Sequence, residues 1–261
     1  MNYSDEQIDD AQSLAIYIAQ WSLRMTTSAK APHIGSCLSA AEITAVIQTI
    51  VNKSEGVFIF SKGHAAATLY ATLAGLKLIP EQLLETFGKD GSELTGHVNC
   101  AIPYVSYSSG SLGHGLPYGL GVAIGSKHKK VYVLISDGEL NEGTTWESLA
   151  IANHLGLENL TLVVDKNGIQ SFGDTKDILD LEPLRAKFES FGWEYLDVDG
   201  HSIDALFNAL TSSDLNKPRA IIAKTTKGKG VKSMENKLEW HYKSPKPENL
   251  QAYLSEVKKN A

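Results

Sequence analysis

The chain has 261 residues, and its 24 basic and 30 acidic side chains give a formal net charge of −6. Apolar residue types make up 43% and charged types 21%, a composition that is typical of folded globular proteins and excludes a disordered chain. The mild acidity without an extended basic run argues against nucleic acid as the main partner, and no apolar stretch approaches the roughly 20 residues that span a bilayer.

The first half of the chain is predicted to be largely helical. Ser4 and Gln7 have the spacing of a capping box and precede apolar residues that recur on one helical face. Ser39 and Glu42 repeat the capping signal before a second apolar-periodic stretch. Helices are therefore expected from Ser4 onward, over 43–51 and over 65–76, and the glycine-rich stretch 110–125 is predicted to be a loop that enters a helix.

Strands and helices alternate from residue 131 onward. Short, nearly uninterrupted apolar runs predict buried strands over 131–135, 160–164, 195–198 and 220–223, with helices over 146–155 and 203–210 and a polar helical tail over 245–259. This alternation predicts an α/β fold, a doubly wound and mainly parallel sheet with helices on both faces. Ligands of such sheets bind beyond the carboxyl ends of the strands.

The chain is expected to form one domain over residues 1–261. Pro and Gly punctuate it without forming a long linker, and the acidic, polar start differs from a secretory signal. Cys37 and Cys100 are far apart and form no CxxC pair, so we expect two reduced thiols in a cytoplasmic protein.

Oxygen-bearing side chains follow two of the predicted strands. Asp137 and Gly138 come directly after the strand over 131–135, and Asn167 follows the strand over 160–164. Taken singly, each tripeptide is more typical of an ordinary turn. Because one crossover helix separates the two strands, they are expected to be neighbours, and a carboxylate and an amide at adjacent strand ends form half of a site for a hard cation such as Mg²⁺.

The same residues carry a resemblance to a known family. Asp137-Gly138, followed after a spacer by Asn167, resembles the thiamin diphosphate fingerprint, and the surrounding sequence resembles the amino-terminal, diphosphate-binding half of transketolase. The matching motifs extend over almost the whole chain: Pro-His-Ile-Gly-Ser at 32–36, Ser-Lys-Gly-His at 61–64, Gly-His at 96–97, Gly-Ser-Leu-Gly-His-Gly at 110–115, Gly138 to Gly143, Lys-Asn-Gly-Ile at 166–169, Asp-Gly-His at 199–201, Lys-Gly-Lys-Gly at 227–230 and Trp-His at 240–241.

The resemblance implies thiamin diphosphate and a divalent metal ion (Mg²⁺, or Ca²⁺ or Mn²⁺) as cofactors. The metal ligands would be the side chains of Asp137 and Asn167 and the carbonyl of Ile169. The contacts to thiamin diphosphate would come from further residues: Gly138, His64 and His241 at the diphosphate, Leu112 at the thiazolium, and Gly110 near the aminopyrimidine.

Catalytic roles are likewise implied by the resemblance. His33 and His97 would line the substrate channel beside His64 and His241, and Glu142 would face the partner subunit near the cofactor. An imidazole near neutral pH can both donate and accept, which suits anion binding and proton transfer. The other histidines are expected to be bystanders: His128 and His154 on the surface, and His201 in a turn.

Several positions depart from the family pattern. Ser136 stands where glycine is common, His114 where glutamine is common, and Ser171 where an apolar residue often touches the thiazolium. The connection that leads into Phe58 and the Ser-Lys-Gly-His motif is also shorter than usual and lacks an Asp-Arg pair.

The resemblance implies one subunit of a split enzyme that transfers a two-carbon ketol unit from a ketose to an aldose. After the last strand about forty residues remain, too few for a second doubly wound domain of ~150 residues. A separate subunit, with the pyrimidine-binding module and a catalytic glutamate, would complete an α2β2 assembly that acts on sugars or sugar phosphates. The alternatives are another thiamin diphosphate enzyme (a decarboxylating synthase or a 2-oxo acid dehydrogenase), or an inactive scaffold. A Mg–nucleotide binder is disfavoured because neither a G-x-G-x-x-G motif after the first strand nor a Walker A loop is present.

Overall fold

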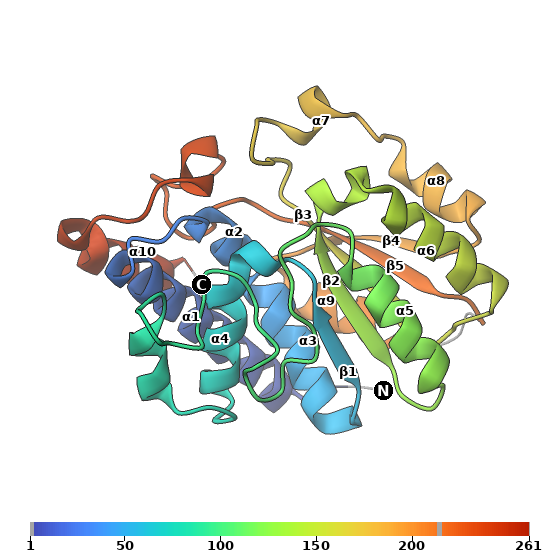
Figure 1. The fold of residues 1–261 in the computed structure, drawn as a ribbon, viewed down its shortest axis with the longest axis horizontal. Coiled ribbons are helices and arrows are strands. Elements are labelled where there is room, and N and C mark those ends of the chain that lie inside the picture. The colour runs from blue at the N-terminus through green and yellow to red at the C-terminus, as the bar shows by residue number, and fades with distance from the viewer. Residues whose placement is uncertain (1–2, 213–215, 261) are drawn as a thin grey trace.

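A five-stranded parallel sheet forms the centre of the computed structural model, which describes residues 3–212 and 216–260 (Figure 1). The strand order is β1-β2-β3-β5-β4, and every neighbouring pair is parallel. The strands are β1 (Val57–Phe60), β2 (Val131–Ser136), β3 (Leu160–Lys166), β4 (Glu194–Asp199) and β5 (Arg219–Lys224). The predicted α/β class and the predicted pairing of β2 with β3 are therefore confirmed.

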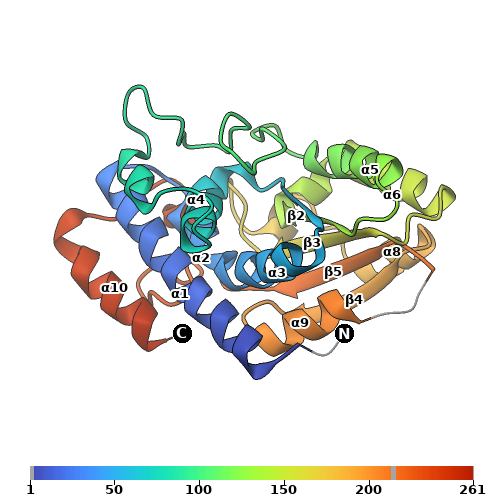
Figure 2. The ribbon, with the colours of Figure 1, turned by 90° about the horizontal axis from the view of Figure 1, so that it is seen from below.

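Helices cover both faces of this sheet, as predicted. Figure 2 shows α3 and α9 on one side of the strands and α5 and α6 on the other. The helices that share a core with the first side are α1 (Asp5–Ser28), α2 (Ile34–Ser39), α3 (Ala41–Ser54), α4 (Ala66–Gly75), α9 (Ile203–Thr211) and α10 (Leu250–Lys259). Those on the second side are α5 (Gly115–Gly125), α6 (Gly143–His154) and α8 (Leu184–Ser190). The remaining short helices are α7 (Thr175–Ile178), η1 (Gly63–Ala65), η2 (Glu81–Thr86), η3 (Asp137–Asn141), η4 (Leu238–His241) and η5 (Pro247–Asn249).

The two cores follow from the alternation of side chains along the strands. In β2, Val131, Val133 and Ile135 point into the core with α5 and α6, whereas Tyr132 and Leu134 point into the core with α3 and α4. All six residues of β2 are buried. Burial on both faces explains why the sequence shows an uninterrupted apolar run.

One of the two predicted helix caps is confirmed and the other is wrong. Ser4 and Gln7 form the complete capping box at the start of α1. Before α3, however, Ser39 belongs to α2 and its hydroxyl donates to Asp165 of β3 at 2.7 Å, while Ala40 precedes the first residue of α3 without a side-chain cap. The tertiary hydrogen bond has taken the hydroxyl that the local pattern assigned to a cap.

Several elements were not expected, among them the helices α7 and α8, and the tail is less polar than expected. The edge strand β1 and the short helix α2 lie in stretches for which we predicted no regular structure. The end of the chain forms α10, whose Tyr253, Leu254 and Val257 are buried in the core with α1. Within the described ranges, no helix is both long and apolar enough to cross a membrane.

Candidate active site

The ends of β2 and β3 converge as predicted. Ser136 pairs with Asp165 in the register of the two strands, so Asp137 and Asn167 both lie just beyond the same edge of the sheet. The Asp137 carboxylate accepts the backbone N–H of Gly168 at 2.7 Å and the hydroxyl of Thr175 at 3.2 Å, both through Oδ2. These contacts bring the stretch after β3 directly onto the end of β2.

The three predicted metal-ligand atoms are in chemically suitable states. Asp137 and Asn167 are buried. Burial and the neighbouring Asp165 raise the pKa of Asp137. A cation beside this carboxylate would counteract that shift and favour its ionised form. The Asn167 side-chain oxygen accepts the N–H of Ile169 at 3.2 Å, and the Ile169 carbonyl accepts from Lys227 at 2.8 Å. Each oxygen keeps a second lone pair. The described residues contain no cluster of three or more His, Cys, Asp or Glu suited to a metal, so an ion here would depend on amide, carbonyl, diphosphate and water oxygens.

Four histidines gather beside these strand ends. The ring of His33 lies 5.4 Å from that of His64, 6.1 Å from that of His97 and 4.7 Å from that of His241, measured between centroids. His33 has a left-handed backbone with φ +72°, and its N–H donates to the carbonyl of His241 at 3.2 Å. Gly110 is also here, since a Cβ added to it would lie 3.9 Å from the ring of His97. The structure thus brings together four histidines from four separate parts of the sequence.

Most of these imidazoles are neutral at physiological pH. Burial lowers the pKa of His33 to about 4 and that of His241 to about 3, and the charge of Lys227 adds to both shifts. Burial and the charge of Lys62 hold the pKa of His64 well below its usual value. As neutral groups, His33, His64 and His241 donate and accept hydrogen bonds but carry no charge with which to attract an anion.

Two buried lysines supply the positive charge of the site, and sequence reasoning gave neither of them a role. Lys62 forms an ion pair with Asp165, and both side chains are fully buried. Lys227 donates to the Ile169 carbonyl, and its Nζ lies 3.0 Å from Nδ1 of His241, so it joins the strand ends to the histidines. Burial and the charge of Lys62 lower the pKa of Lys227 to about 8. The signal in the sequence was the charged Asp165 near the end of a largely apolar strand, because such a carboxylate needs a buried partner.

The loop before α5 carries the remaining predicted contacts. Leu112 is half-buried and precedes Gly113, at which an added Cβ would lie 2.4 Å from the Cβ of Glu142. Glu142 is therefore beside this loop, at the start of α6. At the strand end, Gly138 faces Gln170, whose side chain lies 3.4 Å from the position of an added Cβ.

The histidines predicted to be bystanders lie away from this cluster. His128 and His154 are exposed. His201 is in a turn, where its Nε2 accepts the N–H of Thr226 at 2.8 Å and its Nδ1 lies 3.2 Å from Glu42. Cys37 is buried and Cys100 exposed, and both are free thiols in the structure.

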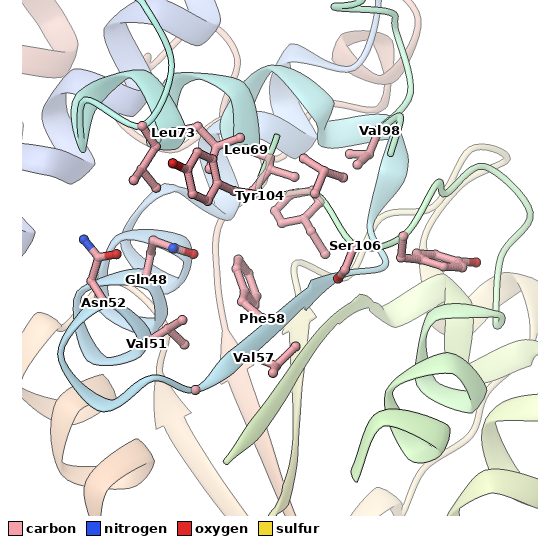
Figure 3. A pocket seen from close by; sticks show the side chains of 15 residues that line it. Gln48, Val51, Asn52, Val57, Phe58, Leu69, Leu73, Val98, Tyr104 and Ser106 are labelled. Atoms are coloured by element: carbon pink, nitrogen blue, oxygen red, sulfur yellow. The ribbon is translucent and has the colours of Figure 1, made fainter. Parts of the chain in front are cut away.

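A separate cavity of about 520 Å³ lies at the edge of the sheet (Figure 3). Side chains of α3, α4, β1 and the segment 98–107 line it, among them Gln48, Phe58, Leu69 and Tyr104. None of the four clustered histidines belongs to its lining. The cavity is therefore distinct from the site at the strand ends.

Comparison with known proteins identifies the family. The model described as "Transketolase, thiamine diphosphate binding domain" matches residues 11–256. The chain belongs to the transketolase family. Two relatives are each named as one subunit of an apulose-4-phosphate transketolase. The protein of Actinobacillus succinogenes is 40% identical over 87% of this chain, and that of Phocaeicola vulgatus is 34% identical over 88% of it. The match covers 87% of each relative.

Solved transketolase structures confirm the fold. The transketolase of Campylobacter jejuni superposes on 99% of this chain with a TM-score of 0.84 and 27% identity. The match covers 43% of that protein, so the chain spans less than half the length of this larger transketolase. It has the length of the two apulose-4-phosphate transketolase subunits, which supports the expected likeness to one subunit of a split transketolase.

Proposed function

We propose that this chain is the diphosphate- and metal-binding subunit of a split transketolase, active together with a second subunit. The observation that carries the proposal is the convergence of Asp137 and the segment after β3, with the Gly168 N–H donating to Asp137 at 2.7 Å. In this arrangement Asp137, Asn167 and the Ile169 carbonyl would hold a divalent ion, and Gly138, His64 and His241 would contact the diphosphate. Bound thiamin diphosphate would supply the electron sink for breaking and forming a carbon–carbon bond.

The remaining residues of the site would orient the reactants and handle protons. Leu112 would pack against the thiazolium and Gly110 would lie near the aminopyrimidine, beside His97. As neutral rings, His33 can donate a hydrogen bond to a sugar oxygen and His241 can donate one to the diphosphate, each while accepting from another group. Lys227 would hold the Ile169 carbonyl in place and provide a positive charge near the diphosphate.

A partner subunit would cover the open side of this site. The helices α5 and α6 lie side by side (Figure 1). They expose Tyr118, Ile124 and Ile151, and Leu155 directly after α6 is exposed as well. Large apolar side chains grouped on adjacent helices are typical of protein interfaces. The partner would bring the pyrimidine-binding module and the catalytic glutamate, with Glu142 facing it, in an α2β2 assembly. The free thiols Cys37 and Cys100 are compatible with a cytoplasmic setting.

The substrates would be a ketose donor and an aldose acceptor. Because two relatives are named for apulose 4-phosphate, a phosphorylated sugar of that kind is the first substrate to test. The part of the sugar that lies farthest from the cofactor would be recognised largely by the partner.

Calorimetry tests the proposal. Thiamin diphosphate with Mg²⁺ should bind weakly to the isolated chain and tightly after addition of the companion subunit, which we expect to be a protein of roughly 300 residues. Asp137→Ala should abolish the metal-dependent binding while the thermal midpoint stays near that of the parent. Asp177→Ala, which removes an exposed carboxylate on α7, is the matched control. Unchanged affinity in Asp137→Ala would remove this residue from the site, and tight binding to the isolated chain would contradict the split arrangement.

A further inference from the structure

Glu139 is a fully buried carboxylate that the proposed function does not use. It lies in η3, two residues after Asp137. Its oxygens accept the Ser61 hydroxyl, the Gly113 N–H at 3.2 Å and the Ser136 N–H at 2.9 Å. None of the ion pairs among the described residues includes Glu139. A buried carboxylate that is held by neutral donors alone is costly unless those donors are fixed in place.

The three donors come from three segments that each carry a candidate cofactor contact. Ser61 follows β1 and precedes His64 by three residues. Ser136 ends β2 just before Asp137, and Gly113 directly follows Leu112. Glu139 therefore joins the end of β1, the end of β2 and the loop before α5 through one side chain.

The other side of Gly113 is held as well. The Thr144 hydroxyl donates to the Gly113 carbonyl at 2.8 Å, and Thr144 lies in the first turn of α6. Gly113 has φ +77°, and a Cβ there would lie 2.4 Å from the Cβ of Glu142, so its backbone packs directly on the stretch 139–144. Both peptide groups that flank the Gly113 Cα are thus bonded to residues of one continuous segment.

We propose that Glu139 and Thr144 are positioning residues that keep the 110–113 loop in register with Asp137. The inference rests on the proposed function, in which Leu112 packs against the thiazolium and Asp137 holds the metal ion at the diphosphate of the same cofactor. A molecule held at two points is oriented only if the distance between these points is fixed, and an error of about 1 Å is sufficient to slow catalysis. Glu139 and Thr144 fix that distance through Gly113, without touching the substrate.

The first test uses the chain alone and needs no cofactor. Amide hydrogen exchange is measured by mass spectrometry at Gly113 and Ser136 in Glu139→Gln and Thr144→Val. Thr144→Ser, which keeps the hydroxyl, and Glu147→Gln, which changes an exposed carboxylate on α6, are the controls. Glu139→Gln replaces one acceptor oxygen with a donor, so exchange at Gly113 or Ser136 should quicken about tenfold or more. Thr144→Val should quicken it at Gly113, and the controls should match the parent. Parental protection in both test variants would overturn the proposal.

The second test uses the complete enzyme with saturating thiamin diphosphate and Mg²⁺. Thr144→Val should lower kcat about tenfold while the KM for the sugar stays the same, and Thr144→Ser should restore kcat. Parental kcat in Thr144→Val, despite faster exchange at Gly113, would also overturn the positioning role. If the parent chain does not bind thiamin diphosphate even in the presence of the companion subunit, the proposed function fails. The exchange experiment still decides whether Glu139 and Thr144 hold the loop.

Discussion

The buried ion pair between Lys62 and Asp165 allows a prediction about stability. Both side chains are fully buried, and Lys62 also donates to the Ser36 carbonyl at 2.7 Å and to the Ser39 hydroxyl at 3.1 Å. The pair therefore fixes α2, and with it the start of the helix at His33, to the end of β3. We consider the substitution Lys62→Met, which keeps most of the side-chain volume and removes the charge.

The expected loss follows from what remains after the substitution. Burial alone would raise the pKa of Asp165, but the charge and hydrogen bond of Lys62, together with the hydroxyls of Thr225 and Ser39, outweigh that effect and hold the pKa below its usual value. Without Lys62, Asp165 keeps only the hydroxyls of Ser39 and Thr225 as partners. Removing one member of a buried pair typically costs about 3–5 kcal/mol, because the other charge is left without compensation. In a chain of this size such a loss lowers the thermal midpoint by roughly 10 °C or more.

Urea unfolding of three variants checks this reasoning. Lys62→Met should lose about 3–5 kcal/mol, whereas the double variant Lys62→Met/Asp165→Asn should recover part of the loss because no charge remains buried. Lys166→Met is the control: its partner Glu182 is half exposed, so that loss should stay below about 1 kcal/mol. If Lys62→Met cost no more than Lys166→Met, or if the two changes at the buried pair were simply additive, the account of this pair would be refuted.

Three further outcomes are expected elsewhere in the molecule. In the complete enzyme, His97→Ala should lower kcat by about 10²-fold or more and leave thiamin diphosphate affinity within a few-fold, as steady-state kinetics and calorimetry can show; unaffected turnover would exclude a role in the substrate channel. The pKa of His241 is about 3 in the folded chain, against 6.5 for an ordinary histidine, so the unfolded chain binds the proton first as the pH falls. The free energy of unfolding should therefore fall as the pH is lowered from 6.5, and His241→Asn should make that fall shallower. An identical pH dependence in the variant would argue against a neutral His241. In α5, Gly119→Ala should lower the free energy of unfolding by about 1–3 kcal/mol, because the new Cβ would lie 2.4 Å from the side chain of Val133. Gly121→Ala, whose Cβ would have no neighbour within 4 Å, should raise it by about 0.5–1 kcal/mol. Equal effects in urea titrations would mean that α5 does not pack on β2 as described.

Burial explains which elements of the fold could be predicted from the sequence. The strands β2 and β3 are enclosed on both faces, so their sequences are apolar throughout and stand out from the helices around them. The edge strand β1 has only four residues, two of them half-buried, which is too short a run to separate from its surroundings. At Ser39 the local pattern suggested a helix cap, but the hydroxyl has a buried carboxylate within reach, a partner that only the tertiary structure supplies.

The order of the strands explains why the predicted metal-ligand side chains of the candidate site could be located from the sequence. Asp137 and Asn167 directly follow two strands joined by a single crossover, so their proximity follows from topology alone. The histidines at positions 33, 64, 97 and 241 lie in segments whose arrangement in space no local sequence pattern specifies. Only the resemblance to transketolase grouped them. The contact between Lys227 and the Ile169 carbonyl spans 58 residues, and no spacing rule predicts such a pair.

The charge distribution of the site changes how an anion would be held there. If the histidines carried the charge, binding of a diphosphate would weaken as the pH rose through 6 to 7. Because burial instead keeps His33 and His241 neutral, that dependence shifts to Lys227, whose pKa is about 8. A diphosphate beside Lys227 would raise that pKa further by stabilising the ammonium form, so binding would take up a proton in weakly alkaline solution. A sugar oxygen beside His33 would meet a neutral imidazole throughout the physiological range, and that hydrogen bond would therefore be insensitive to pH there.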